Sequence, residues 1–397
     1  MHFDFLIVGG GLVGLGTAWQ LSQRFSDATI CLIEKESRVA AHQSGRNSGV
    51  LHSGIYYKPG SLKAVTCRAG KLLMEEFCQQ EEIAYENCGK IIVATEELEL
   101  PRLQSIYERG LQNQVRCTLI DAQEIVELEP HAAGLKGIHV PDAGIVDYPA
   151  VCRKIMEKLQ SVGHKVQLNT EIRSIEVNSE SVIVNSSNES FQASFLITCG
   201  GLHSDRLVAM SGQQPPARIV PFRGEYYELL PDAHHLVRNL IYPVPDPSFP
   251  FLGVHFTRMV NGEVECGPNA VLALSREGYT WGTLRVSDLV ESLTYSGFQQ
   301  LALKHWRMGL GEIQRSLSKA AFVKALQRLV PSIQASQLKR GRAGVRAQAL
   351  ARDGALIDDF LWVSNPRMLH VCNAPSPAAT ASFEIGRQIV DRVASEI

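Results

Sequence analysis

The sequence predicts an α/β protein: a Rossmann-like nucleotide-binding domain with an inserted α+β substrate domain built on a mostly antiparallel sheet. Three observations predict this fold. A strand, a glycine-rich turn, a helix and a second strand follow one another at the N-terminus. Alternating extended stretches begin near Arg218, and strands followed by a helix return at the C-terminal end.

The N-terminal unit has a strand at 3–8, a helix at 12–24 and a strand at 29–34, because apolar β-branched runs flank a helical apolar stripe. A loop rich in Gly and Ser follows over 42–60. Ser61 then suits the N-cap of a helix that runs to about residue 80.

The same patterns predict the remaining elements. In order they are a strand at 91–94, a helix at 97–113, helix starts at Asp121 and Tyr148, a hairpin at 172–185, a strand at 195–199, extended strands at 219–229, 251–258 and 264–267, helices between 288 and 328, strands near Leu361 and Leu369, and a helix from about Ala378. We therefore assign residues 1–85, 146–215 and 336–397 to the nucleotide-binding domain and residues 86–145 and 216–335 to the substrate-binding domain.

Composition excludes several classes of protein. The 397 residues are 45% hydrophobic and 20% charged, which is ordinary for a globular chain and excludes a disordered, collagen-like or coiled-coil one. Lys and Arg number 39 against 41 Asp and Glu, so no overall basic field attracts nucleic acid.

Nine scattered cysteines without a CxxC pair predict neither a disulfide framework nor a zinc site, and we expect no metal. The apolar run at the N-terminus is too short to span a bilayer and follows no basic segment. We expect a cytoplasmic protein, and peripheral contact with the inner face of the membrane stays open.

The glycine turn has the pattern of a dinucleotide site. Gly9, Gly11 and Gly14 form GxGxxG between the first strand and the first helix, and Glu34 ends the second strand 20 residues after the last glycine. The helix N-terminus favours the pyrophosphate, and a carboxylate at Glu34 accepts hydrogen bonds from the adenosine ribose. The carboxylate disfavours NADP, whereas the motif alone allows both FAD and NAD.

Further blocks along the chain are more specific than this motif. In order they read DFLIVGGGLVG, SGRNSGVLHSGIYYKPGSLKA, RIVPFRGEYY, PFLGVHFTR, GPNAVLAL, AGVRAQAL and HVCNAPSPAATAS. With them the chain resembles the FAD-dependent oxidoreductases of the D-amino-acid-oxidase type over essentially its whole length. Within that group it is most similar to the L-2-hydroxyglutarate oxidase/dehydrogenase family.

The resemblance implies a reaction. FAD, which we expect to be non-covalent, would hold its flavin ring between the two domains and accept a hydride at N5 from L-2-hydroxyglutarate, giving 2-oxoglutarate. Oxygen or a quinone would then take the electrons. An amine or amino-acid oxidase on the same scaffold is the alternative.

The residues supply candidates for the chemistry. Removing the hydroxyl proton requires a base, for which His255 is favoured over His52; His52 would otherwise orient substrate or flavin. Arg223 and Arg346 lie in apolar surroundings and are candidates for the substrate carboxylates, with an internal ion pair as the alternative for each. Lys63 is a third candidate cation, unless it is merely solvated.

The remaining cofactor candidates are backbone positions. Ser48 and Gly49 would pass close to the ring, and Gly200 ends a buried strand. The helix start after the proline-rich segment would stabilise negative charge on the reduced ring through Ser376, Ala378 and Thr380. The resemblance also implies a main-chain contact of Ile172 with adenine.

Overall fold

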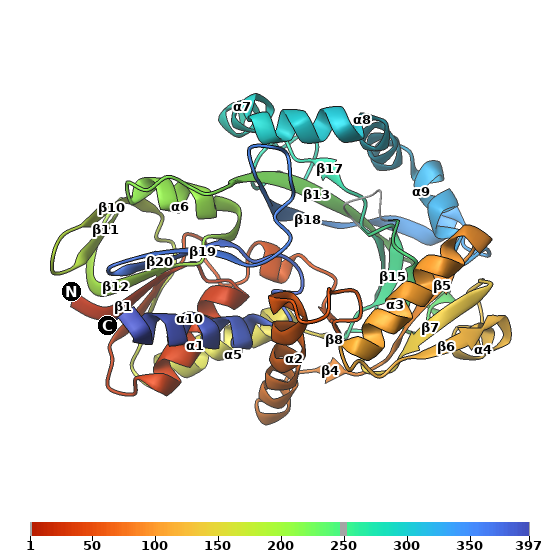
Figure 1. Cartoon of the computed structure of the whole chain (residues 1–397), viewed down its shortest axis with the longest axis horizontal. Coiled ribbons are helices and arrows are strands. Elements are labelled where there is room, and N and C mark those ends of the chain that lie inside the picture. The colour runs from red at the N-terminus through yellow and green to blue at the C-terminus, as the bar shows by residue number, and fades with distance from the viewer. Residues whose placement is uncertain (1, 247–251, 397) are drawn as a thin grey trace.

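The computed structural model describes residues 2–246 and 252–396, which form two large sheets side by side (Figure 1). The first sheet lies on the left of the view and the second on the right, and both chain ends lie beside the first. Position 251 of the strand expected at 251–258 lies outside the described residues, and the observed strand begins at His255.

The first sheet is the mainly parallel one. Its strands run in the order β10 (Ile172–Val177), β11 (Val182–Ser186), β12 (Ser190–Thr198), β1 (His2–Val8), β2 (Ile30–Ile33) and β9 (Lys165–Gln167), with β20 (Met368–Asn373) beside β12 and β19 (Leu361–Asn365) beside β20. The buried run Phe5–Val8 pairs in parallel with both β2 and β12, which is why it contains apolar residues on both faces.

Helices bury the two faces of this sheet. One face packs against α1 (Leu12–Arg24), α2 (Leu62–Gln80), α5 (Tyr148–Ser161) and α10 (Ser382–Glu396). The short α6 (Ser204–Met210) lies on the other face. Ser61 caps α2 as expected, since its side chain accepts a hydrogen bond from the Ala64 N–H.

The second sheet is mostly antiparallel. Its order is β17 (Val271–Leu272), β13 (Arg218–Leu229), β16 (Val264–Gly267), β15 (His255–Arg258), β14 (Leu240–Pro243), β5 (Lys90–Ala94), β7 (Lys136–Val140) and β6 (Thr118–Asp121), with β18 (Leu338–Leu350) beside β13. A small sheet of β3 (Val50–Leu51), β8 (Gly144–Val146) and β4 (Tyr85–Glu86) is separate.

The helices of this half are α3 (Leu100–Gln112), α4 (Ala122–Leu128), α7 (Val286–Thr294), α8 (Ser296–Leu317) and α9 (Lys319–Leu326). Figure 1 shows α7, α8 and α9 as an outer row along the upper edge of the second sheet. The observed fold confirms the predicted class, an α/β nucleotide-binding half with an inserted, mainly antiparallel half.

One strand near a predicted boundary pairs with the second sheet. The strand Leu338–Leu350 follows position 336 and was assigned to the nucleotide-binding domain, but it pairs with β13 in the second sheet. The pairing runs from Arg218 opposite Leu350 to Leu229 opposite Leu338. An alternating sequence shows that a segment is a strand but not which sheet it joins. The rest of the domain division stays a prediction.

Candidate active site

The glycine turn between β1 and α1 leaves no room for side chains. Gly9 has φ of +117°, and a Cβ there would collide with the carbonyl oxygen of Cys199. A Cβ on Gly14 would collide with the carbonyl oxygen of Gly9, and one on Gly11 would lie 3.0 Å from the Ser44 hydroxyl. The helix therefore starts directly against the strand ends, as a pyrophosphate-binding turn requires.

Glu34 lies where the sequence motif places it. Glu34 directly follows β2, and its buried carboxylate accepts the Gly10 N–H at 2.6 Å and the Glu36 N–H at 2.9 Å. The Leu12 N–H at the start of α1 donates to the Ser44 hydroxyl at 2.9 Å. The closely packed glycines and this oriented carboxylate fit the adenosine and pyrophosphate portion of FAD.

The other predicted cofactor positions fall into two groups. Ile172 begins β10 and belongs to the same buried cluster as Val8 and Ile33, the last residues of β1 and β2. Gly200 comes shortly after β12. The second group lies in the Gly- and Ser-rich loop over residues 42–60 that contains His52, which we call the histidine loop. There Gly49, next to Ser48, has φ of +66° and approaches the Val146 carbonyl.

Thr380 joins the histidine loop to the C-terminal segment. Its hydroxyl accepts the His52 backbone N–H at 3.1 Å and bonds the Tyr148 hydroxyl at 2.9 Å. Ser376 and Ala378 lie in the same segment, between β20 and α10. The loop and this segment, which are far apart in sequence, therefore lie against each other.

His255 lies on β15 in a buried, aromatic environment. Its Nδ1–H donates to the Gly253 carbonyl at 2.8 Å, and because a carbonyl only accepts, the unprotonated nitrogen is Nε2. The Tyr242 ring lies 4.0 Å from the imidazole, centroid to centroid. This arrangement provides a fixed ring with a lone pair available for a proton.

Both candidate histidines are neutral near pH 7. Burial, together with the charges of Lys90, His255 and Lys63, lowers the pKa of His52 to about 3. Burial also lowers the pKa of His255 to about 3; the Gly253 carbonyl opposes this shift, while Arg346 and Lys90 reinforce it. The cluster therefore holds two neutral imidazoles close to cations.

Arg346 and Arg223 occupy opposite faces of the second sheet. Arg346 on β18 is opposite Phe222 on β13, and Arg223 is opposite Val345, so alternation points the two arginines in opposite directions. The charge of Arg346 acts on Tyr226 as well as on His255. Arg346 is thus near enough to His255 for its charge to disfavour a proton on the imidazole.

Arg223, the first of the two arginines predicted to bind the substrate carboxylates, has a protein anion beside it, while its buried Nη1 has no hydrogen-bond partner among the described residues. Arg223 is fully buried and donates to Glu225 from Nε at 3.2 Å and from Nη2 at 2.9 Å, with its guanidinium 4.4 Å from the Trp281 ring. Burial without an anion would be costly, and Glu225 supplies that anion. Arg223 therefore takes the internal ion pair, the alternative considered for it.

Lys63 also has a protein partner. Its Nζ donates to the Asp358 carboxylate at 2.8 Å and lies 5.1 Å from the Tyr57 ring. These residues border a hollow of about 670 Å³ that is also lined by Tyr56. Lys63 lies at the edge of the cluster, since its charge also reaches His52.

Sequence reasoning missed Lys90. It is the first residue of β5, is 2% exposed, and lies among Tyr56, Tyr242 and the two histidines. The sequence contains a signal, because a lysine directly precedes the apolar run 91–94. A lysine is rarely buried in a strand like β5, which is buried along its whole length, so such a position suggests a functional role.

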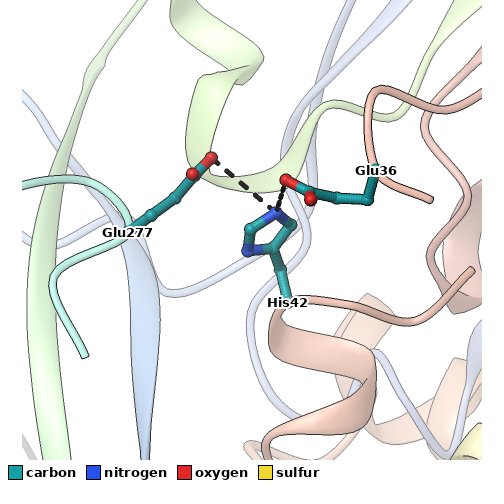
Figure 2. A group of neighbouring side chains, drawn as sticks. All are labelled: Glu36, His42 and Glu277. Atoms are coloured by element: carbon teal, nitrogen blue, oxygen red, sulfur yellow. Dashed lines mark hydrogen bonds and ion pairs between the residues drawn. The ribbon is translucent and has the colours of Figure 1, made fainter. Parts of the chain in front are cut away.

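A polar network joins the two halves near Glu34. Figure 2 shows Glu36 and His42 from the first half meeting Glu277 from the second; His42 Nε2 lies 2.9 Å from Glu36 and 3.7 Å from Glu277. Lys35 Nζ contacts both carboxylates, at 2.7 Å for Glu36. The Lys35 ammonium balances the charge of the Glu36 and Glu277 carboxylates, so their proximity does not require a metal ion.

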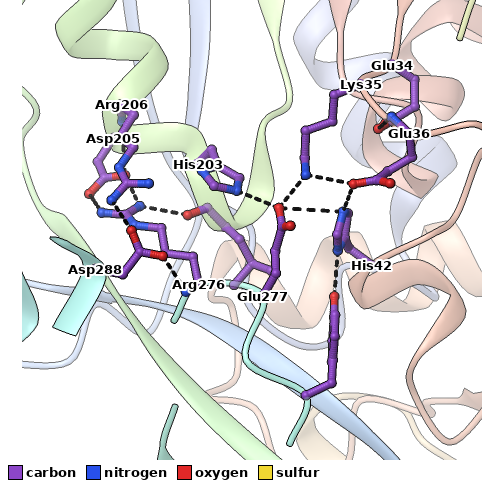
Figure 3. A network of polar contacts seen from close by, with 12 residues as sticks. Glu34, Lys35, Glu36, His42, His203, Asp205, Arg206, Arg276, Glu277 and Asp288 are labelled. Atoms are coloured by element: carbon purple, nitrogen blue, oxygen red, sulfur yellow. Dashed lines mark hydrogen bonds and ion pairs between the residues drawn. The ribbon is translucent and has the colours of Figure 1, made fainter. Parts of the chain in front are cut away.

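The network continues beyond this group in Figure 3. His203 Nε2 lies 2.8 Å from Glu277, and His203 and Lys35 together hold the pKa of Glu277 well below its usual value, against the effect of burial. Next to it, buried Arg276 pairs with Asp205. These ion pairs fix the second half against the end of β2.

The chain matches a family of known proteins over almost its whole length. Residues 4–392 match the family described as FAD dependent oxidoreductase. The chain belongs to this family. It is an oxidoreductase with FAD as its cofactor, in agreement with the shape of the glycine turn and the position of Glu34.

Three curated relatives bear the same name, L-2-hydroxyglutarate dehydrogenase. The protein of Indibacter alkaliphilus is 49% identical over 98% of each chain. That of Escherichia coli K12 is 47% identical over 98% of this chain and 93% of its own, and the human mitochondrial protein is 47% identical over 98% and 88%. The resemblance to that family is confirmed.

Solved structures show the same fold at low identity. L-alpha-glycerophosphate oxidase from Mycoplasma pneumoniae, solved with FAD bound, has a TM-score of 0.80 at 23% identity and covers 98% of this chain and 94% of its own. Glycine oxidase from Geobacillus kaustophilus has a TM-score of 0.72 at 18% identity, covering 100% and 95%. In the described part of the chain, no helix combines the length and apolar character needed to cross a bilayer.

Proposed function

We propose that this enzyme oxidises L-2-hydroxyglutarate to 2-oxoglutarate. The observation that carries the proposal is the buried, neutral His255, whose Nε2 is free to accept a proton while Arg346 lies beside it. An alcohol needs such a base because its proton is held tightly near pH 7, and a carboxylate needs such a cation. The names of the curated relatives support the same substrate.

Each residue has one task in this proposal. Arg346 binds a substrate carboxylate and orients the carbinol carbon, and His255 Nε2 takes the hydroxyl proton as the carbonyl forms. His52, tied to Thr380 through its backbone N–H, orients the substrate at the ring. FAD, when bound, would supply an acceptor for the carbinol hydrogen as a hydride, so that two electrons would leave the substrate as one proton goes to the histidine.

Anaerobic bleaching of the flavin tests the proposal. L-2-Hydroxyglutarate is expected to bleach the yellow protein fully. Its D isomer, which has the opposite configuration, L-lactate, which has no second carboxylate, and L-glutamate, which has no hydroxyl, are each expected to bleach it at least about 100-fold more slowly. Bleaching by an amino acid, with none by L-2-hydroxyglutarate, would instead establish the amine-oxidase alternative. Adding air or a soluble quinone to the bleached protein then identifies the electron acceptor.

We also propose that the protein contacts a membrane surface through α8. This helix kinks at His305; after the kink it exposes Trp306, Leu310, Ile313 and Leu317 at helical spacing, and Leu303 is exposed just before it. Leu303 is 78% exposed. So many exposed apolar side chains on one helix are unusual on a monomer, and Figure 1 shows α8 at the outer edge of the molecule.

The charges on α8 favour an anionic lipid surface over a second protein chain. Lys304 and Arg307 are exposed next to the apolar face, while the one acidic residue of the helix, Glu312, is buried. An apolar stripe with a basic rim matches a headgroup layer that carries negative charge. A cytoplasmic enzyme that delivers electrons to a quinone would use such a surface.

Vesicle sedimentation tests this contact. The holoenzyme is expected to bind vesicles containing phosphatidylglycerol, and replacing Leu303, Trp306 and Leu310 with Glu weakens binding at least about tenfold while flavin bleaching is unchanged. Leu98→Glu is the control, because Leu98 is also exposed but lies outside α8. If the wild type forms a dimer that the triple variant abolishes, and neither binds vesicles, the occupant is a second copy and the membrane proposal is wrong.

A further inference from the structure

Lys90 has a buried ammonium group to which the described residues supply no anion. The side chain is 2% exposed, and Nζ lies 4.7 Å from the Tyr56 ring centroid and 5.0 Å from that of Tyr242. Among the residues that the structure describes, none forms a hydrogen bond or an ion pair with Nζ. A buried cation without a partner is costly, so the site calls for a negatively charged ligand.

A second group beside Lys90 lacks a partner. The Tyr56 hydroxyl is buried and accepts or donates no hydrogen bond within the described ranges 2–246 and 252–396. Buried polar groups are nearly always satisfied, so an unpartnered Tyr56 hydroxyl near the Lys90 ammonium indicates a site that a polar ligand completes. The aromatic walls around them suit the methylene groups of that ligand.

The position of Lys90 connects it to the reaction. Its charge acts on His52 and on His255, and the charge of Arg346 acts on His255 too. The base therefore has two cations near it, on β5 and on β18. In the part of the chain that is described, no carboxylate contributes to the pKa shift of either histidine.

We propose that Lys90 binds the distal carboxylate of the dicarboxylic substrate while Arg346 binds the carboxylate next to the carbinol carbon. This inference rests on the proposed function and deepens it. The planar fork of an arginine fixes the orientation of a carboxylate beside the reacting carbon, where geometry matters most. A lysine acts as a point charge, which suits a carboxylate at the end of a flexible chain.

Binding would also activate the base. The charges of Lys90 and Arg346 disfavour a proton on His255 in the free enzyme, and two bound carboxylates cancel those charges. The imidazole then accepts the hydroxyl proton more readily when a diacid is bound than when a monoacid is bound. Lys90 therefore selects for diacids in binding and in rate.

Substrate pairs test this assignment. L-2-Hydroxypentanoate has a methyl group in place of the distal carboxylate. For Lys90→Met, kcat/KM for flavin reduction by L-2-hydroxyglutarate is expected to fall about 100-fold or more, with little change for L-2-hydroxypentanoate. Arg346→Met is expected to lower both values. Lys71→Met is the matched control, because Lys71 is also buried but pairs with Glu75 on α2.

Lys90→Arg supplies a readout that a merely structural role would not change. Burial lowers the pKa of Lys90 to about 8, so the ammonium loses its proton as pH rises through that value, and KM for the diacid rises. An arginine stays charged, so the variant keeps the diacid preference without this alkaline rise. The rise is absent for L-2-hydroxypentanoate in the wild type.

Two outcomes would overturn the inference. One is a Lys90→Met holoenzyme with normal flavin absorbance and an unchanged ratio between the two substrates. The other, decisive if that variant does not fold, is the same alkaline rise in Lys90→Arg as in the wild type. Failure of L-2-hydroxyglutarate to bleach the wild type would instead refute the proposed function, so the two failures are distinguishable.

Discussion

Replacing His255 with Ala is expected to slow anaerobic flavin reduction by L-2-hydroxyglutarate about 10²–10⁴-fold, because the hydroxyl proton loses its acceptor. Affinity for the product 2-oxoglutarate should change far less, since the cations that bind its carboxylates remain. Stopped-flow absorbance under nitrogen measures the first quantity, and product titration of the flavin spectrum measures the second.

The control for this variant is His164→Ala, because His164 contacts Ser22 in the first half of the molecule and lies outside the histidine cluster. Its reduction rate should match that of the wild type. A rate for His255→Ala within about threefold of the wild type would show that His255 is not the base, and the same measurement on His52→Ala would then decide whether His52 takes that role.

The pH dependence of kcat/KM depends on the pKa of the histidine base. A histidine base works when neutral, so activity is lost as pH falls through its pKa. Because burial lowers the pKa of His255 to about 3, kcat/KM should not fall between pH 8 and about pH 5.5. A histidine at its ordinary value near 6.5 would lose most of its activity over the same interval.

Gly14→Ala is expected to abolish flavin binding, and this is the second large effect. The added methyl would overlap the Gly9 carbonyl oxygen and press on the Cys199 side chain at 3.4 Å, which forces α1 away from β1. The turn that holds the pyrophosphate then opens. The flavin-to-protein absorbance ratio of the purified protein measures this loss, and we expect less than about a tenth of the wild-type value.

Gly309→Ala is the matched control. Gly309 is also helical, in α8, but a Cβ there meets nothing within 4 Å. The substitution should keep full flavin content and, if anything, stabilise the helix slightly. Normal flavin content in Gly14→Ala would contradict the packing role assigned to this glycine.

Local signals predicted the elements of the fold well. The strand, glycine turn, helix and Glu34 of the N-terminal unit, the cap at Ser61 and the long helices after 285 follow from periodicity and capping over a few residues. The membership of the strand Leu338–Leu350 did not follow. Its partner β13 lies more than 100 residues earlier, and no local pattern encodes that pairing.

The sequence also singled out residues of the candidate site without showing all of their contacts. The block containing His255 and the block containing Arg346 stood out as short motifs with chemically distinctive residues in apolar surroundings. Arg223 looked equivalent to Arg346 in the sequence. Glu225, two residues further on, lies on the same face of β13 and forms an ion pair with Arg223. The sequence alone left both the internal ion pair and the substrate role of Arg223 open.

The sequence by itself determined which residues have chemical potential, because turn geometry, strand alternation and residue type are properties of short segments. Only the tertiary structure decided which of them meet, because register between β13 and β18 sets the face on which each arginine lies. It also brought Lys90, from a strand beside β14, near the histidine of β15, with no carboxylate partner for its charge among the described residues. Side-chain neighbours across a sheet depend on pairings between distant segments, and those pairings exist only in the folded chain.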